Sequence, residues 1–208
     1  MTHALVSLRI PDWEDYVALY AQRFEQQVMH WADEVDEVPT IAAYVYRRME
    51  RQSLDNYVER IIDLEGPGPA PRRPIGTISA CGVDRQRGEG TLSVVIVDPT
   101  CWGKGYGSEA LTLFLQLLSR EGLRRIHLET FADNKRAQAA FRKAGFRPTH
   151  CFHEPSIDRH IVLMVCDLSP EQPAAPPPPP ASICSPGSNL ILDLETLAPT
   201  PARKHPAH

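Results

Sequence analysis

Apolar residues recur along the chain at two spacings, one typical of strands and one typical of helices. Alternation predicts a strand over residues 5–10. Helical spacing predicts a helix from residue 11 to about 27 and a second from about 39 to 58. Residues 58–64 are compatible with either a helix end or a strand, and the glycines and prolines that follow predict an extended loop.

The middle of the chain predicts a hairpin followed by a crossover. Residues 75–83 and 91–97 are two β-branched runs joined by a polar turn, which indicates an antiparallel pair. A mostly buried helix is expected over residues 109–120 and a further strand over residues 124–131.

A short helix and one more strand complete the pattern. Asn134 is expected to cap the helix, Gly145 to end it, and residues 159–165 to form the last strand. Strands and helices in this order predict an α/β fold with a mixed, mostly antiparallel sheet that is flanked by helices.

Composition divides the chain into two parts. Of the 208 residues, 42% are hydrophobic and 23% charged, which suits one globular domain, expected over residues 1–168. Residues 169–208 are proline-rich and are expected to be a disordered tail. Within the tail, residues 190–194 are apolar, so they are compatible with docking on the domain or on a partner as well as with an unstructured segment.

Charge and targeting signals narrow the class of protein. The N-terminus lacks the pattern of a signal peptide and no apolar run approaches the about 20 residues of a membrane span, so a cytoplasmic protein is expected. Five scattered cysteines indicate free thiols. A net charge of −4 argues against nucleic-acid binding and is compatible with a cationic substrate. The protein is expected to be a monomer or a homodimer.

A glycine-rich stretch, Trp102-Gly103-Lys104-Gly105-Tyr106-Gly107-Ser108, lies between a strand and a helix. Such a loop directs several backbone N–H groups to one place, where the helix dipole also favours negative charge. The stretch therefore predicts a phosphate site, with a glycine turn that binds nothing as the alternative.

Two other phosphate-binding designs agree less well with this stretch. A P-loop needs Ser or Thr after its lysine, whereas Lys104 is followed by Gly105. A dinucleotide fingerprint would use Glu129, 22 residues after Gly107, as its ribose-binding acid. The G-x-G-x-G spacing and the residues between strand and loop disfavour it.

Three runs of residues extend the pattern: Trp102-Gly103-Lys104-Gly105-Tyr106-Gly107-Ser108-Glu109-Ala110, Asn134-Lys135-Arg136-Ala137 and Phe141-Arg142-Lys143-Ala144-Gly145-Phe146. At this separation they resemble the GNAT superfamily of acetyl-CoA-dependent N-acetyltransferases, in particular its ribosomal-protein-alanine acetyltransferase branch. The resemblance is strong over residues 75–146. It implies a GNAT-like fold and transfer of an acetyl group from acetyl-CoA to a primary amine.

The resemblance also implies a set of cofactor contacts. The loop amides would hold the CoA pyrophosphate, the strand backbone near Val95 and Val97 would pair with the pantetheine arm, and the capping asparagine would bond the same arm. The cofactor-binding residues implied in this way are Val95, Val97, Trp102, Gly103, Lys104, Gly105, Tyr106, Gly107, Ser108 and Asn134. The basic residues near the short helix, Lys135, Arg136, Arg142 and Lys143, are either solvated or in contact with the CoA phosphates.

The catalytic groups are less well defined than the cofactor loop. The amine must lose a proton before it attacks, and Glu129 and Glu154 are the candidate bases, each with an ordinary surface carboxylate as the alternative. Phe141 stands where many relatives carry a tyrosine that protonates the leaving thiolate, so no acid is assigned. Residues 149–158 also form a shorter segment than the family pattern.

Two functions remain open after this step. One is an N-acetyltransferase whose acceptor is a protein N-terminus, a polyamine or an antibiotic amine, and the other is a non-catalytic acetyl-CoA-binding protein. No metal is expected, because His150, Cys151, His153, His160 and Cys166 follow no zinc-binding spacing. Four aromatic residues near the N-terminus suit either the core or an acceptor pocket: Trp13, Tyr16, Tyr20 and Trp31.

Overall fold

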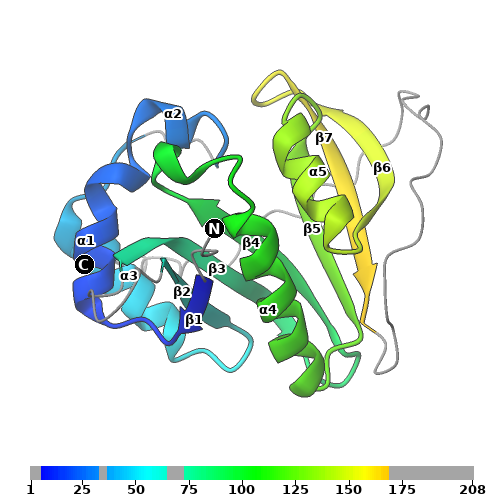
Figure 1. Ribbon diagram of the computed structural model, residues 1–208, viewed down its shortest axis with the longest axis horizontal. Coiled ribbons are helices and arrows are strands. Elements are labelled where there is room, and N and C mark those ends of the chain that lie inside the picture. The colour runs from blue at the N-terminus through cyan, green and yellow to red at the C-terminus, as the bar shows by residue number, and fades with distance from the viewer. Residues whose placement is uncertain (1–5, 33–36, 65–72, 169–208) are drawn as a thin grey trace, which may run out of the picture.

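The computed structural model of the protein describes residues 6–32, 37–64 and 73–168. Within them, one seven-stranded sheet runs in the order β1-β2-β3-β4-β5-β7-β6, with helices on both of its faces (Figure 1). The strands are β1 (Val6–Arg9), β2 (Val58–Leu64), β3 (Arg73–Asp84), β4 (Glu89–Ile96), β5 (Arg125–Phe131), β6 (Arg147–Glu154) and β7 (Arg159–Asp167). The helices are α1 (Trp13–Arg23), α2 (Gln26–Met29), α3 (Ile41–Gln52), α4 (Tyr106–Arg120) and α5 (Lys135–Lys143), with a 3₁₀ turn at Pro99–Cys101.

Only the pairing of β4 with β5 is parallel in this sheet, and it is short. It joins Glu89 to Arg125, Gly90 to Ile126 and Thr91 to His127, and no pairing follows. The other neighbouring strands pair antiparallel over longer stretches. Beyond Thr91 the sheet is therefore split into an N-terminal half (β1 to β4) and a C-terminal half (β5 to β7).

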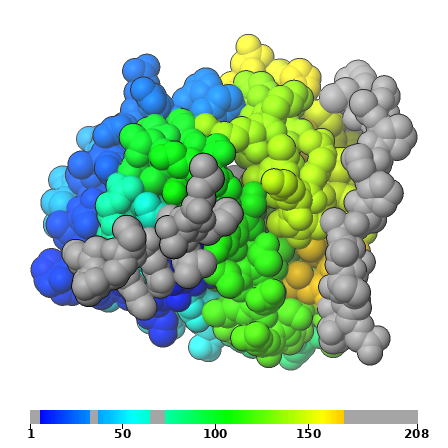
Figure 2. Space-filling model, in the orientation of Figure 1, coloured from blue at the N-terminus to red at the C-terminus, as the bar shows by residue number. Residues whose placement is uncertain are grey.

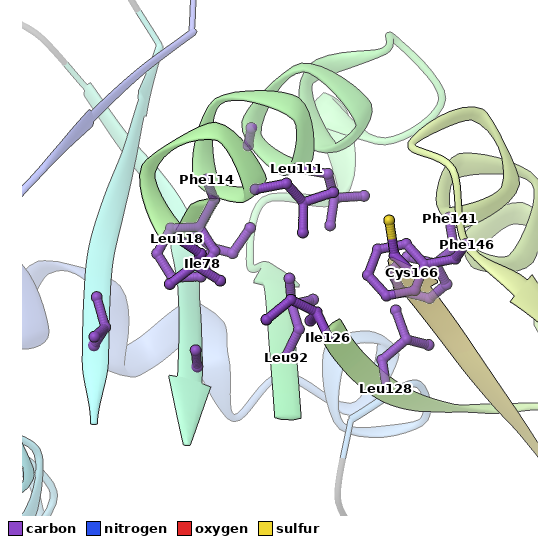
Figure 3. Packing of buried hydrophobic residues seen from close by; sticks show 14 of the residues in the cluster. Ile78, Leu92, Leu111, Phe114, Leu118, Ile126, Leu128, Phe141, Phe146 and Cys166 are labelled. Carbon is purple, nitrogen blue, oxygen red and sulfur yellow. The ribbon is translucent and has the colours of Figure 1, made fainter. Parts of the chain in front are cut away.

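The larger core lies between the sheet and α4 and continues under α5 (Figure 3). Leu111, Phe114 and Leu118 of α4 are almost fully buried at helical spacing. Fully burying a side chain such as Phe114 contributes about 3 kcal/mol. Phe141 of α5 and Phe146 pack edge to face, 6.0 Å between ring centroids, and join the same core to the C-terminal half.

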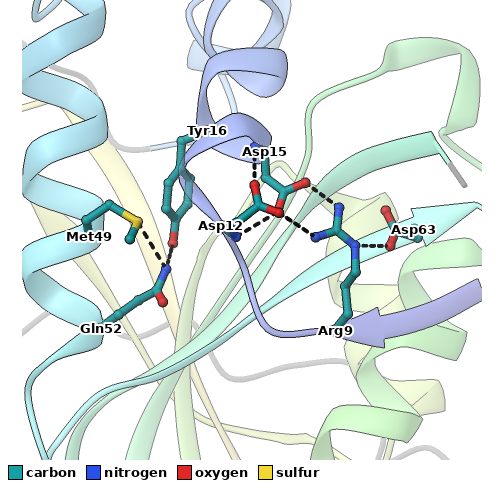
Figure 4. Close-up of polar contacts among 7 residues, drawn as sticks. All are labelled: Arg9, Asp12, Asp15, Tyr16, Met49, Gln52 and Asp63. Atoms are coloured by element: carbon teal, nitrogen blue, oxygen red, sulfur yellow. Dashed lines mark hydrogen bonds and ion pairs between the residues drawn. The ribbon is translucent and has the colours of Figure 1, made fainter.

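An ion-pair network joins β1, α1 and β2 (Figure 4). The guanidinium of Arg9 donates to Asp63 over 2.6 Å and to Asp15, and both carboxylates are buried. Burial alone raises the pKa of Asp15, but the hydrogen bonds from Arg9 and from the backbone of Asp12 outweigh this effect and lower it. The network fixes the start of α1, which Asp12 caps through the amide of Asp15.

The structure confirms the expected fold class and the hairpin of β3 and β4. It resolves residues 58–64 as strand β2. The first two predicted helices were too long: α1 ends at Arg23 before the separate α2, and α3 spans only Ile41–Gln52. The described helices include none long and apolar enough to cross a membrane.

Strand β6 was missed because its side chains do not alternate in polarity. His150, Cys151, Phe152 and His153 mix polar and apolar residues without a period of two. β6 is an edge strand that pairs only with β7, so its residues are exposed or half-buried. No buried face imposes a hydrophobic pattern on such a strand. The proposed domain boundary at residue 168 coincides with the end of the described residues. The apolar segment 190–194 lies outside them.

Candidate active site

A cavity of about 450 Å³ lies where β4 and β5 separate. One wall is the glycine loop and the start of α4, another is α5, and the residues at and after α2 form a third. The lining residues that matter below are Val28, Trp31, Ala32, Val94, Val95, Ile96, Trp102, Gly103, Gly105, Gly107, Ser108, Asn134, Arg136 and Phe141.

Backbone conformation explains two of the loop glycines. Gly103 and Gly105 have φ angles of +73° and +92°, which side chains rarely adopt. α4 begins at Tyr106, three residues earlier than expected, and Gly105 is its N-cap. Glycine has no side chain with which to cap the first amides of α4. These amides are therefore available to an anion at the positive end of the helix dipole.

The register of β3 and β4 decides which backbone groups face the gap. The N–H of Val97 donates to the carbonyl of Ile75 over 2.9 Å, so Val97 points toward β3. Antiparallel alternation gives Val95 the same direction, whereas Val94 and Ile96 point their backbone groups away from β3 and toward the gap. This differs by one position from the expectation that backbone groups near Val95 and Val97 meet the cofactor. Val97 is also buried, in a small cluster with Leu19 and Val28, and is not among the residues that line the cavity.

Trp102 connects the loop to both halves of the sheet. Its indole N–H donates to the carbonyl of Ile96 over 2.8 Å, at the edge of β4 that faces the gap. The guanidinium of Arg136, from the start of α5, lies 4.0 Å from the centre of the indole. Burial lowers the pKa of Arg136. The loop and α5 accordingly lie side by side on one face of the molecule (Figure 2).

The remaining loop residues occupy different environments. Ser108 lines the cavity, whereas Lys104 is exposed and Tyr106 packs against the larger core. Neither Lys104 nor Tyr106 is among the lining residues. Lys104 therefore reaches an anion only by extending from the exposed loop.

Asn134 caps α5 as expected. Its Oδ1 accepts a hydrogen bond from the N–H of Ala137 over 3.1 Å, and the side chain is buried. Asn134 also lines the cavity, so its side-chain amide and the start of α5 border the gap. Gly145 follows α5 with φ of +97°, which agrees with its expected role in ending the helix.

Asp98 holds the turn before the loop, as its place next to Pro99 indicates, through a set of hydrogen bonds that also includes a distant arginine. Asp98 accepts from the N–H and the hydroxyl of Thr100 over 2.8 and 2.6 Å, and from the guanidinium of Arg73 over 2.5 Å. The hydrogen bond from the Thr100 hydroxyl, together with that from Arg73, lowers the pKa of Asp98 to about 2. Arg73 is 25 residues from Asp98 in sequence, so only the β3–β4 pairing reveals the contact.

The two candidate bases do not lie against the cavity wall. Glu129 is on β5, exposed, opposite Leu163 of β7. Glu154 ends β6, and one of its oxygens accepts from the hydroxyl and the N–H of Ser156, which lowers the pKa of the carboxyl. Phe141 is buried and does line the cavity, as its family position implies.

The four N-terminal aromatic residues separate into different roles. Tyr16 is fully buried and donates to Glu59, Tyr20 donates to the carbonyl of Pro39, and Trp13 is exposed. Only Trp31 of the four lines the cavity. The contribution of Val28 and Ala32 to the same wall was not predicted, because α2 has a single turn and no helical pattern. The described residues contain no group of three or more His, Cys, Asp or Glu that is arranged to hold a metal ion.

Comparison with known sequences identifies a family match. Residues 6–147 match the model of the acetyltransferase (GNAT) domain. The match covers more than half of the chain, and it does not distinguish the ribosomal-protein-alanine branch from others. No curated protein sequence matches the chain significantly.

Solved structures with the same architecture come from several organisms. The chain is similar to a domain from Methanocaldococcus jannaschii, with a TM-score of 0.64 and 20% identity over 79% of this chain and 99% of that one. It is also similar to the spermidine N-acetyltransferase of Vibrio cholerae in complex with CoA and spermine (TM-score 0.69, 14% identity, 78% and 95% covered). A third similar structure is the aminoglycoside acetyltransferase AAC(6')-Ib with coenzyme A (TM-score 0.63, 20% identity, 78% and 95% covered). At these identities the likeness shows the fold.

Proposed function

The chain belongs to the acetyltransferase (GNAT) family, and from this premise we propose that it transfers the acetyl group of acetyl-CoA to a primary amine. The observation that carries the proposal is the cavity in the β4–β5 gap, whose wall includes the uncapped start of α4. Such a gap suits a long, narrow acyl carrier with a polyphosphate at one end.

We assign the cofactor contacts by chemical type. The amides from Gly103 to Ser108 hold the pyrophosphate, because they lie at the positive end of the α4 dipole. The pantetheine arm pairs with the backbone of Val94 and with the N–H of Ile96, since the alternation of β4 directs these groups to the gap. Asn134 borders the same gap and offers its side-chain amide to the arm.

The reaction is a direct transfer between the two substrates. The nitrogen of the neutral amine attacks the carbonyl carbon of the thioester, the C–S bond breaks, the nitrogen gives up one proton to water, and the products are an amide and CoA. The ammonium form of the substrate first loses a proton, which a carboxylate accepts directly or through water. Glu129 is the better candidate, because the hydrogen bonds from Ser156 make Glu154 a weaker base.

The leaving thiolate receives no proton from the residue at the family's tyrosine position. Phe141 has no acidic proton, and its ring packs against Phe146 in the core. We propose that CoA leaves as the thiolate and is protonated by water, because a thiol with an ordinary pKa of about 8.5 is a fair leaving group near neutral pH.

The acceptor class is drawn from the relatives. Structures similar to this one include a spermidine acetyltransferase and an aminoglycoside acetyltransferase, and the sequence motifs resemble a branch that modifies protein N-termini. A polyamine, an aminoglycoside and a peptide with an N-terminal alanine are therefore the first acceptors to test.

The test is release of free CoA thiol from acetyl-CoA in the presence of each amine, with a reaction that lacks amine as control. Mass spectrometry of the acceptor should show one added acetyl group. Acetyl-CoA binding without thiol release across the panel would contradict catalysis and would favour a non-catalytic acetyl-CoA-binding protein. If the protein neither bound acetyl-CoA nor released free thiol from it, the cofactor assignment would be wrong.

A further inference from the structure

Arg159, the first residue of β7, makes contacts that no cofactor role explains. Its guanidinium donates to the carbonyl of His30 over 2.8 Å and to the carboxylate of Asp133 over 3.0 Å. It also lies 3.4 Å from the centre of the Phe131 ring and 5.6 Å from that of Trp31. The side chain is only 15% exposed. We call these five residues the Arg159 clasp.

The clasp joins the two halves of the split sheet. Phe131 ends β5, Asp133 follows that strand, and Arg159 begins β7, so these three belong to the C-terminal half. His30 and Trp31 follow α2, in the N-terminal half. Backbone pairing between the halves stops at Thr91 and His127 (Figure 1).

Strand alternation places the clasp on one particular face of the sheet. Ile126 and Leu128 of β5 point into the core that α4 and α5 cover. Glu129 and Phe131 therefore project to the opposite face. The guanidinium of Arg159 covers the Phe131 ring, so the clasp lies on the face of the sheet that carries the candidate base.

Trp31 connects the clasp to the cavity, because it is the clasp residue that lines the wall. His30 and Trp31 have their rings edge to face, with centroids 4.4 Å apart. A hydrogen bond to the His30 carbonyl therefore also restrains the position of its neighbour Trp31. The clasp thus holds the segment that carries Trp31 against the ends of β5 and β7.

We propose that Arg159 is a positioning residue for the amine acceptor: it holds Trp31 across the gap and so shapes the entrance through which the amine reaches the thioester. The inference rests on the proposed acetyl transfer. Apart from Trp31, no clasp residue lines the cavity, and none belongs to the glycine loop or to α5, so we expect acetyl-CoA binding to depend on the clasp much less than acceptor binding does.

The experiment compares full-length wild type with Arg159→Ala, Arg159→Lys and the control Arg147→Ala. Arg147 is an exposed arginine on β6 that pairs with Asp167. Two quantities are measured: KM for the amine and for acetyl-CoA in steady-state kinetics, and hydrogen exchange of peptides that cover residues 26–32.

In Arg159→Ala we expect KM for the amine to rise about tenfold, KM for acetyl-CoA to change less than about twofold, and exchange over residues 26–32 to increase. Arg159→Lys should recover part of both effects, because one ammonium keeps the charge opposite Asp133 but does not supply the planar fork. Arg147→Ala should match wild type in both measurements.

Unchanged exchange over residues 26–32 in Arg159→Ala would overturn the clasp itself. Increased exchange with an unchanged amine KM, or an equal rise in both KM values, would overturn its role in acceptor entry. These results are distinct from failure of the proposed function, in which wild type itself would transfer no acetyl group to any amine.

Discussion

The indole N–H of Trp102 donates to the backbone carbonyl of Ile96, with 2.8 Å between nitrogen and oxygen. Ile96 is the last residue of β4, at the point where the strand has no partner on its gap side. One side chain of the glycine loop thereby satisfies the last carbonyl of β4 on the gap side and links the loop to the cavity wall.

Trp102→Phe is expected to weaken acetyl-CoA binding about fivefold. The phenyl ring retains apolar packing and a surface for Arg136 but cannot donate to Ile96, and a neutral hydrogen bond contributes about 1 kcal/mol. Isothermal titration calorimetry with acetyl-CoA measures the change. Trp13→Phe is the matched control, since Trp13 is exposed on α1. Equal weakening in both variants would contradict a specific role for the Trp102 contact.

Gly107→Val should lower acetyl-CoA affinity at least about tenfold while leaving the free energy of unfolding within about 1 kcal/mol. The nearest atom to a Cβ at Gly107 is the Ile96 side chain at 4.0 Å, so a larger side chain extends into the cavity without a backbone clash. Valine and glycine also differ little in helix propensity. Calorimetry and urea unfolding separate the two quantities.

Gly122→Val is the control for this substitution, with the opposite expected result. Gly122 has φ of +90° in the turn after α4, far from the lining residues of the cavity. Valine there should cost about 1–2 kcal/mol of stability through the left-handed conformation, and acetyl-CoA affinity should stay unchanged. If Gly107→Val lost stability and kept its affinity, the phosphate-cradle assignment would be wrong.

Asp98→Asn should remove about 2 kcal/mol of stability near pH 7. The folded pKa of Asp98 is about 2, below the ordinary value of 3.8, so the ionised carboxylate stabilises the fold above pH 4. This contribution declines as the pH falls below about 4 and is lost fully only below about pH 2, where the carboxylate is protonated in both the folded and the unfolded state. Urea unfolding at several pH values should therefore show the difference between wild type and variant shrinking in that range.

Asp167→Asn serves as the comparison for the pH experiment. Asp167 pairs with Arg125 and Arg147 on the surface, and these bonds also lower its pKa, but its side chain is 43% exposed. Solvent screening limits such pairs to at most about 1 kcal/mol.

A pH-independent difference in the free energy of unfolding between wild type and Asp98→Asn would show that Asp98 acts as a cap alone, with no contribution from its charge.

Local signals in the sequence predicted the glycine loop, the Asn134 cap and the β3–β4 hairpin, because each depends on neighbouring residues. The predicted start of α4 was three residues too late, because Gly105 is the N-cap of the helix and has no capping side chain that the sequence could show. The sequence did not show that the backbone groups of Val94 and Ile96 face the gap, because this direction is set by the register between β3 and β4.

Contacts between segments far apart in the chain could not be predicted from local sequence patterns. Arg73 and Asp98 meet only when β3 and β4 pair, and Arg159 reaches His30 across 129 residues of sequence. Neither arginine differs from a solvated surface residue in its local sequence. The tertiary structure therefore revealed these two long-range contacts, whereas the sequence predicted the family and the glycine loop.

Glu129→Gln should lower kcat about 100-fold with little change in KM for acetyl-CoA, because general-base catalysis contributes at least about this factor. Glu129 projects from β5 to the face that carries the Arg159 clasp. Glu154→Gln should lower kcat less than about threefold, since this carboxylate is held by Ser156 in the β6–β7 turn. Steady-state kinetics of both variants decides between the two carboxylates: a larger loss in Glu154→Gln would reverse the assignment, and small losses in both would indicate that water alone accepts the proton.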